Sequence, residues 1–383
     1  MTTPAPGATP AVRSGDDLLA TGHVLLYRLW DLGDEIDLEM ADRLFADSAP
    51  ARRRPVRFEA RALSIPTPPL VVALGTSRLA LGEQSFDVES TAALFDFGVV
   101  SLRLQLSLPR SARWSHLVAL AGSLADQPVL EALAHERRDL LLQRVRPAVR
   151  RLHIAATTED YTVVRLTRLT DATGNPHDPR RLRKRQLAEL LLPEGATLDS
   201  RTLASLLAHR SSYTMQDLTV LGWDAALVVE PDPSDSDVEL LLEFANAQLL
   251  ELRIYDDRLD AEVREMGRRI AAARRHAAGF FTRSYRTLLI GLLTVVADTA
   301  ELVERAENAF KVTDDIYLGR IYTEAMALFR ADAWRADIAR KLETLRATYT
   351  MLHDETQTTR AHLLEIAIVL LFVLDITLAL LLD

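Results

Sequence analysis

The sequence predicts an α+β N-terminal domain followed by a long helical hairpin or coiled coil that ends in a single C-terminal transmembrane helix. Three observations support this prediction. Short apolar runs, partly alternating as in strands, fill the chain up to residue 231. Beyond residue 236, apolar residues recur every three or four positions, as in long amphipathic helices. The last run, Ile366–Asp383, is almost entirely apolar.

The bulk composition is that of a globular protein. Of the 383 residues, 48% are hydrophobic and 26% are charged, and the absence of cysteine excludes disulfides and thiolate metal sites. The net charge of −9 argues against attraction of the whole protein to nucleic acid. Residues 1–21 are polar and lack the apolar core of a signal peptide, so we expect a disordered leader there.

Residues 22–231 are expected to form the α+β domain. The predicted strands are 23–32, 54–63, 69–75, 92–108, 161–169 and two short strands within 217–231 that flank a Gly-Trp-Asp turn. The predicted helices are 37–45, 115–124, 129–145 and one that follows the loop 171–186. Pro231–Asp235 ends the domain, because its prolines stop the strand and the next residues can cap a helix.

Residues 236–360 are expected to form the helical hairpin or coiled coil. One apolar seam runs from Val238 to Ile270 and a second from Ile338 to Ile366. Two amphipathic helices of this length must pair with each other or with another chain. The apolar run Thr287–Ala297 lies between them, and its eleven residues reach only about half of the roughly 30 Å hydrocarbon core. We therefore expect it to be a buried helix of the bundle.

The closing apolar run is expected to be a membrane anchor over residues 363–382. Ile366–Leu382 has seventeen residues, the lower limit for a span, and two further leucines precede it. Arg360 and His362 stand on its N-terminal side and no cation follows, which predicts an inner or cytoplasmic membrane protein with its bulk in the cytoplasm and its C-terminus across the membrane. The alternative is an oligomer in solution that buries this helix at its centre.

Asp375 lies inside the apolar run, and a carboxylate there should avoid lipid because its insertion costs about 2.5–3.5 kcal/mol. We favour a role in oligomer formation, protonated or hydrogen-bonded against a neighbouring helix, over a proton or ion path. Glu365, ten residues earlier, is expected at the interface with water.

Catalytic patterns are sparse. Asp96-Phe97-Gly98 spells the metal-binding tripeptide of kinases, but the Gly-rich loop, strand lysine and His-Arg-Asp loop that a kinase needs do not precede it. Gly98 is better explained by a bulge or close approach inside a strand. The histidines show no metal-ligand spacing, and there is no phosphate-binding glycine loop or nucleophile elbow. We therefore expect no enzyme, no cofactor and no metal.

One basic segment stands out within the acidic chain. It comprises Arg180, Arg181, Arg183, Lys184 and Arg185. The default interpretation is a solvated face, and the alternatives are contact with anionic lipid headgroups or with RNA phosphate. No aromatic residues interleave the run, so it contains no platform for base stacking.

Three segments resemble the required-for-meiotic-nuclear-division (RMND-like) family of membrane-anchored proteins. The first is "LFDFGVV" at 94–100, with Phe97 and Gly98. The second is "AQLLELRIYDDRLD" at 247–260. Its matching positions include Gln248, Tyr255, Asp256 and Arg258. The third is the Leu-Glu entry at Leu364 and Glu365 into a closing helix with an internal acid, Asp375.

The resemblance spans residues 22–383 and implies an α+β domain, a helical hairpin and a membrane anchor. It departs from the family at Ile366, where the family usually has Trp, and at Asp375, where it usually has Glu. It also implies a non-enzymatic role, since mitochondrial members support translation by holding ribosomes near the inner membrane.

These observations lead to one main functional hypothesis and two alternatives. The main one is a membrane-anchored scaffold that forms a homo-oligomer through its helices and presents the α+β domain to a cytoplasmic protein partner. The first alternative is a tether for ribosomes or RNA at the membrane, which depends on the basic segment. The second is an enzyme with a site assembled from scattered carboxylates and arginines of the α+β domain.

Overall fold

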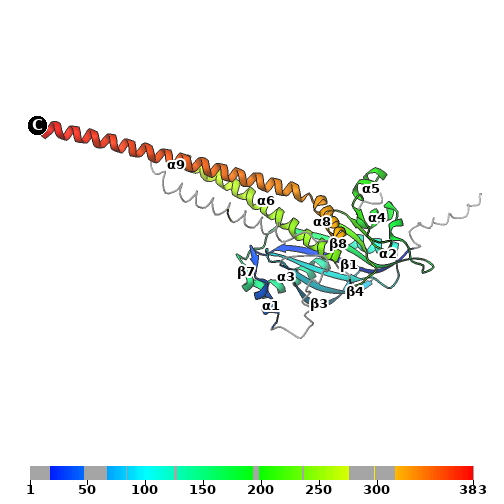
Figure 1. The fold of residues 1–383 in the computed structure, drawn as a ribbon. Helices are drawn as coiled ribbons and strands as arrows, with labels where there is room; N and C mark the ends of the chain where they lie inside the picture. Colours follow the sequence, from blue (N-terminus) through cyan, green and yellow to red (C-terminus); the bar gives the residue numbers. More distant parts are fainter. Residues whose placement is uncertain are drawn as a thin grey trace, which may run out of the picture. The chain divides into compact units, whose positions relative to one another are not determined.

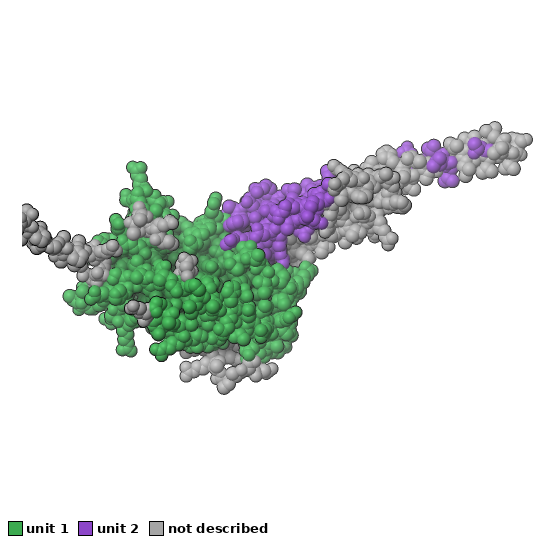
Figure 2. Space-filling model, turned by 180° about the vertical axis from the view of Figure 1, so that it is seen from behind, with its two compact units in different colours: residues 1–251, 308–331 green, residues 252–307, 332–383 purple. Residues whose placement is uncertain are grey.

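The computed structural model describes residues 18–46, 67–82, 84–124, 127–192, 198–234, 237–275, 297 and 315–382. Within the two longest helices, the side chains of residues 269, 272–275, 352–364, 366–367, 373–376 and 378–382 are not described. The chain divides into two compact units (Figure 2). Unit 1 comprises Met1–Glu251 and Asn308–Ala331, and unit 2 comprises Leu252–Glu307 and Asp332–Asp383.

Unit 1 is built on a mixed sheet to which nine of the described strands belong, in the order β3-β4-β5-β1-β8-β11-β10-β9 with β6 paired to β1. All its pairs are antiparallel except β8 with β11. The strands are β1 (Leu18–Asp31), β3 (Leu70–Leu81), β4 (Gln84–Leu94), β5 (Val99–Ser107), β6 (Ala112–Arg113), β8 (Thr158–Asp171), β9 (Arg210–Ser211), β10 (Leu218–Leu221) and β11 (Ala225–Val229). A separate pair joins β2 (Glu35–Ile36) to β7 (Val149–Arg150).

Helices cover both faces of this sheet (Figure 1). The helices of the described chain are α1 (Leu38–Ala46), α2 (Trp114–Leu124), α3 (Pro128–Val145), α4 (Lys184–Leu191), α5 (Ser200–Leu206), α6 (Asp237–Arg275), α8 (Ile316–Leu328) and α9 (Ala331–Leu382), with short 3₁₀ turns η1 (Arg146–Ala148) and η2 (Pro179–Arg181). The predicted α+β domain is therefore present, and its predicted helices and most of its predicted strands are confirmed.

One face of the sheet is apolar. Every second residue of β1, such as Val24, Leu26 and Trp30, joins a core with alternate residues of β5 and with the inner sides of α1–α5. Arg28 also belongs to this series of β1, and its Nη2 reaches the carboxylate of Glu131 on α3 at 2.7 Å. The charge is thus paired where it meets the helix layer.

The opposite face is covered by the first part of α6. Fourteen consecutive residues of α6, Val238–Glu251, are buried or nearly so, and this part of the helix is enclosed on every side. Phe244 anchors it in an aromatic cluster, with ring centroids 5.9 Å from Phe95 and 6.2 Å from Phe97. α8 lies against the same part of α6, where the hydroxyl of Tyr322 donates to Gln248.

The prediction of one strand over residues 92–108 is wrong. The chain forms a hairpin of β4 and β5, and Phe95–Gly98 make the turn. Gly98 has φ +101°, and a Cβ there would lie 1.8 Å from the carbonyl oxygen of Gly33. Gly98 thus permits the predicted close approach, but in a turn between two strands. Asp96 lies in this turn, where its carbonyl accepts from the N–H of Ile36 at 2.9 Å.

The structure corrects one other expectation for unit 1 and leaves a second one untested. β1 begins at Leu18, inside the segment expected to be a leader, because Leu18–Thr21 pair with the end of β8. The strand expected at 54–63 lies outside the described residues. The Gly222–Asp224 turn between β10 and β11 is confirmed, and α6 begins at Asp237, just after the expected boundary.

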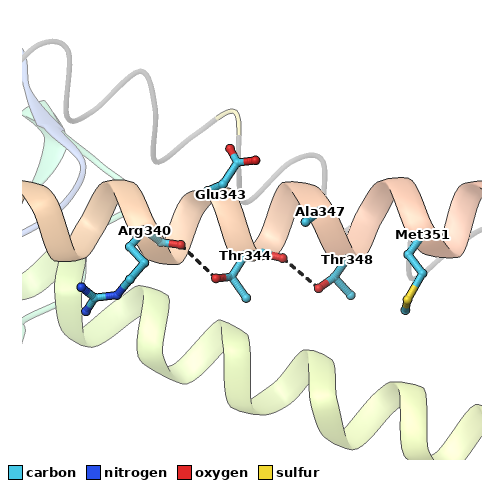
Figure 3. A pocket seen from close by; sticks show the side chains of 6 residues that line it. All are labelled: Arg340, Glu343, Thr344, Ala347, Thr348 and Met351. Atoms are coloured by element: carbon cyan, nitrogen blue, oxygen red, sulfur yellow. Dashed lines mark hydrogen bonds between the residues drawn. The ribbon is translucent and has the colours of Figure 1, made fainter.

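Unit 2 contains the rest of α6 and nearly all of α9, which lie side by side (Figures 1 and 3). Their facing residues are buried: Leu252, Tyr255, Leu259 and Met266 on α6, and Ile338, Leu342 and Leu345 on α9. The two helices run in the same direction (Figure 1). The predicted long hairpin, which requires antiparallel neighbours, is therefore wrong. The helix expected at 287–297 falls outside the described residues apart from 297.

The predicted transmembrane anchor over 363–382 is also wrong. Among the described residues, no single helix is long and apolar enough to cross a membrane, although α2 and the segment Pro128–Ala148, bent by 59°, reach that criterion together. Ile366–Leu382 extends only about 25 Å at 1.5 Å per residue, less than the roughly 30 Å hydrocarbon core. Extension toward the N-terminus brings in Glu365 in addition to Asp375. The membrane localisation predicted from this anchor is therefore wrong as well.

Candidate functional site

A groove runs along one side of α9 (Figure 3). It has a volume of about 480 Å³ and is lined by Arg340, Glu343, Thr344, Ala347, Thr348 and Met351. They form two adjacent rows with a spacing of four positions, 340-344-348 and 343-347-351, which lie on one side of the helix. We refer to this set as the α9 groove.

The chemistry of the α9 groove suits packing against another apolar surface. The hydroxyl of Thr344 donates to the carbonyl of Arg340 at 2.9 Å, and that of Thr348 to the carbonyl of Thr344 at 2.8 Å. Because both hydroxyls are turned back to their own helix, the threonines present methyl groups beside Ala347 and Met351. Arg340 forms an ion pair with Asp337 at 2.8 Å. The small side chains allow another helix to approach closely.

A lysine clamp holds α9 to α6 within unit 2. Lys341 Nζ lies 2.7 Å from a carboxylate oxygen of Asp256 and 2.5 Å from one of Asp260. Burial alone would lower the pKa of Lys341, but its hydrogen bonds to the two aspartates raise it. Asp256 and Tyr255, singled out in the sequence, thus help to join the two helices: Tyr255 is buried, and Asp256 pairs with Lys341. Arg258 is partly exposed on the same helix.

The far part of α9 is apolar and exposed. Ile368, Val369, Leu370, Leu371 and Phe372 are 53–64% exposed. Five successive residues at 100° intervals point to all sides of a helix, so no single neighbouring face covers them. Glu365, just before them, is exposed, but the membrane interface expected around it is wrong because the anchor is wrong. The side chain of Asp375 lies outside the described part of the structure.

A second candidate lies buried between the sheet and α6. Arg165 of β8 pairs with Glu239 of α6, with Nε 2.7 Å from Oε1 and both side chains at most 5% exposed. Arg165 also donates to the carbonyl of Asp232 at 2.8 Å. One turn further along α6, Glu243 lies near Arg103 of β5, whose Nε donates to Thr91 Oγ1 at 3.0 Å. We refer to these residues, with His23 and Tyr27, as the polar layer.

Burial dominates the protonation of the polar layer. It raises the pKa of Glu243, although Arg103 and Ser101 beside it act in the opposite direction. Burial, together with the charge of Glu243, raises the pKa of Tyr27 far above its ordinary value. Burial first, and then the charges of Arg165 and Arg103, lower the pKa of His23 to about 4. His23 is therefore neutral at physiological pH.

Sequence reasoning missed this layer. Its signal is in "VELLLEFANAQLLEL", where acids stand four and eight positions apart in a helix whose other residues, apart from Asn246 and Gln248, are apolar. An enclosed helix of this kind needs cationic partners for its carboxylates. A search for catalytic patterns alone does not reveal that requirement.

A contact between His153 and Asp31 lies at the C-terminal end of β1. His153 Nε2 lies 3.1 Å from Asp31 Oδ2, and its Nδ1 lies 2.9 Å from the carbonyl oxygen of Arg151. Both ring nitrogens therefore face acceptor oxygens. Asp31 also accepts from the backbone N–H of Gly33 at 3.0 Å. These contacts attach the segment after β7 to the turn after β1.

The basic segment has local partners. Arg180 donates through Nε and Nη2 to Asp178 at 3.0 Å each, and this holds the pKa of Asp178 at about 2. Arg183 donates to Gln186 at 3.1 Å, and Arg185 lies 3.5 Å from Glu189. Lys184 is exposed at the start of α4. The solvated-face interpretation fits this pairing, and contact with anionic lipid or RNA stays a prediction.

The remaining residues singled out in the sequence have packing roles. Phe97 stacks on Phe95 at 5.2 Å and is buried, and Gln248 accepts from Tyr322 inside unit 1. Among the described residues, no group of three His, Asp or Glu side chains is close enough to hold a metal ion. The residues of the three segments that carried the family resemblance do not meet in one site within the described structure.

Comparison with known proteins identifies the family. The family described as "Uncharacterized protein MJ0711, N-terminal domain" matches residues 21–236, more than half of the chain. The chain belongs to this family. The matched part runs from β1 to the residue before α6.

A relative from Methanocaldococcus jannaschii, "Uncharacterized protein MJ0711", is 23% identical over 222 residues. This alignment covers 58% of the chain and 66% of the relative, so the chain spans just under two thirds of the length of the relative it matches. No solved structure matches. The resemblance to the RMND-like family stays a prediction that these matches do not test.

Proposed function

We propose that this protein is a non-enzymatic scaffold that self-associates through α9 and presents its α+β domain to a protein partner. The observation that carries the proposal is the exposed apolar segment Ile368–Phe372. A helix that is apolar on every side is stable in water only when other apolar surfaces surround it. Each large side chain that becomes fully buried contributes about 1.5–3 kcal/mol, so five of them favour association strongly.

Further copies of α9 are the surface that best surrounds such a segment. Symmetric assembly brings the same apolar residues of each chain to one axis, and every chain then buries its own segment. The α9 groove, some twenty residues earlier on the same helix, gives a place where small side chains let helices of neighbouring copies approach. The described residues that line the groove all belong to α9, so its open side can receive a helix of a second copy.

The polar layer supports a non-catalytic role for the sheet. Its arginines and glutamates are buried and face one another, as in Arg165 with Glu239. A catalytic pair needs access to a substrate, whereas the side chains of Arg165 and Glu239 are at most 5% exposed beneath α6. Its groups are therefore better suited to holding α6 than to chemistry.

The test is the molar mass of the full chain in solution, measured by light scattering during size-exclusion chromatography. We expect a discrete oligomer. The double variant Leu370→Asp, Leu371→Asp should dissociate it, because the new carboxylates of neighbouring chains would then repel one another at the axis. The matched control is Thr350→Asp, an exposed position of the same helix outside the apolar segment.

Each outcome bears on the proposal. Dissociation of the double variant with retention of the oligomer in the control supports it. A monomeric wild-type chain, or an oligomer that both variants leave intact, contradicts it. Far-ultraviolet circular dichroism of each variant verifies that the helices remain.

A further inference from the structure

Exposed large apolar side chains gather where β9 forms the edge of the sheet. Tyr213 and Met215, in the loop between β9 and β10, are 78% and 69% exposed, and Ile316 at the start of α8 is 89% exposed. The ring of Tyr317, next to Ile316, lies 5.7 Å from that of Tyr213 between centroids. Several large apolar side chains exposed together are typical of a protein interaction site.

The loop that carries Tyr213 and Met215 is held in one shape. The buried carboxylate of Asp217 accepts from the backbone N–H groups of Tyr213 at 2.8 Å and Thr214 at 2.9 Å. The Thr214 hydroxyl accepts in turn from the N–H groups of Gln216 and Asp217 at 3.1 and 3.3 Å. Little conformational entropy is therefore lost when this loop meets a partner.

The side contributed by α8 is equally ordered. Asp315 caps the helix by accepting from the N–H groups of Tyr317 at 2.7 Å and Leu318 at 3.1 Å. The hydroxyl of Tyr317 lies 3.2 Å from Thr219 Oγ1 of β10. The loop and the helix start thus form one continuous surface on unit 1.

The basic segment lies beside this surface. Arg210 of β9 donates to the carbonyl of Arg180 at 2.5 Å, and the charge of Asp217 acts on Arg180. Arg181 is 81% exposed and only loosely paired, at 3.7 Å from Asp178. The six cations here outnumber the carboxylates around them, which are Asp178, Glu189, Asp217, Asp315 and Glu324. The cations are Arg180, Arg181, Arg183, Lys184, Arg185 and Arg210.

We propose that the surface formed by Tyr213, Met215, Ile316 and Tyr317 binds an acidic protein segment that carries an aromatic or aliphatic anchor. The apolar side chains receive the anchor, and the cations from Arg180 onward attract the acids. Tyr, Met and Arg are the residue types enriched at protein interfaces. The net charge of −9 disfavours nucleic acid as the partner.

This inference rests on the proposed function and gives the partner-facing surface of the scaffold. The experiment is selection of a displayed random dodecapeptide library on the full-length protein, with counter-selection on the Tyr213→Ala, Ile316→Ala variant. One enriched peptide is then fluorescently labelled and titrated by anisotropy. We expect enriched peptides to combine Asp or Glu with an aromatic or aliphatic residue.

The variants give the expected sizes of effect. Tyr213→Ala should weaken binding of the peptide at least about tenfold, as for a hot-spot residue. Arg181→Gln should weaken it a few-fold and reduce its salt dependence. Leu140→Ala, an exposed apolar position on α3, is the matched control and should leave binding unchanged.

Several outcomes overturn the inference. These are no enrichment over the counter-selected variant, enriched peptides without acids, equal binding by Tyr213→Ala, or tighter binding of a labelled 20-mer oligouridylate that Tyr213→Ala weakens. The titration is repeated on the Leu370→Asp, Leu371→Asp chain. Peptide binding that persists there separates failure of self-association from failure of this surface.

Discussion

The two faces of the sheet in unit 1 differ in how they hold the helices that cover them. Beneath α1–α5, Val24, Leu26 and their neighbours form an apolar core, at which the charge of Arg28 is paired with Glu131. Beneath α6, arginines from β5 and β8 meet glutamates of the helix. The first face gains stability from removing apolar area from water, which is not directional.

The second face shows what a polar layer adds. Replacing a buried ion pair by apolar residues is often neutral or stabilising, so the pairs are poorly explained as a source of stability. They do, however, favour one register of α6, because a shift by one turn would bring one glutamate to the other's arginine and leave the second glutamate buried without a partner. We infer that the apolar face supplies stability and that the polar layer positions α6.

The largest expected effect is from breaking one pair of the polar layer. Arg165→Met leaves Glu239 buried without its guanidinium, and should lower the free energy of unfolding by about 3–5 kcal/mol in urea denaturation. The double variant Arg165→Met, Glu239→Leu removes both charges and should recover most of that loss. A double variant as unstable as the single one would show that the pair itself stabilises the fold.

The apolar face gives the next comparison. Leu26→Ala creates a cavity in the core between the sheet and its helices, and should cost about 3 kcal/mol of unfolding free energy in the same assay. We expect no second substitution nearby to recover this unfolding free energy in the way that Glu239→Leu recovers it for Arg165→Met. A loss below about 1 kcal/mol would mean that this core collapses around the cavity and that the contrast between the faces is wrong.

The polar layer also predicts a dependence on pH that the apolar face lacks. Because the pKa of His23 falls from 6.5 to about 4 on folding, its contribution is complete above pH 6.5 and is lost as the pH falls toward 4. After allowance for the part of the imidazole that water reaches, the loss is about 1–2 kcal/mol. The free energy of unfolding in urea, measured for wild type and His23→Gln between about pH 7.5 and 4, isolates this contribution. If the two proteins lose the same free energy over this pH range, the prediction is contradicted.

The smallest effect is expected at the rim of the polar layer. Thr91→Val keeps the shape of the side chain but removes the acceptor for Arg103 Nε, now at 3.0 Å. One hydrogen bond of this kind contributes about 1 kcal/mol, so a modest shift in the urea midpoint is expected. Thr76→Val, on an exposed part of β3, serves as the control.

Much of unit 1 could be predicted from local sequence signals. Alternating side chains located β5 and β8, and the Gly222-Trp223-Asp224 turn located the β10–β11 hairpin. The "LFDFGVV" segment misled because its apolar residues continue through the turn, where Phe95 and Phe97 pack against Phe244 from a distant helix. The need for glycine at position 98 comes from Gly33, which no local pattern reveals.

Contacts between distant segments set the rest. The direction of α9 relative to α6 depends on the return of the chain to unit 1 before α9 begins, and a periodic seam is the same in parallel and antiparallel pairs. The aromatic residues beside the basic segment come from a loop about thirty positions later and from α8. No aromatic residue interleaves the basic segment itself, so the sequence of that run could not reveal these neighbours.

Unit 1 is assembled from two separate stretches of chain, and this has a consequence during synthesis. Its last strand ends at Val229, whereas α8 begins at Ile316. At about 5–20 residues per second, the ribosome needs roughly 4–17 s to bridge that interval. During that time all strands of the sheet have been translated, but α8 has not. All the helices of the apolar face, α1–α5, precede Val229 in the chain, so the sheet face that is still incompletely covered is the one that carries Arg103, Arg165 and His23, which water solvates well.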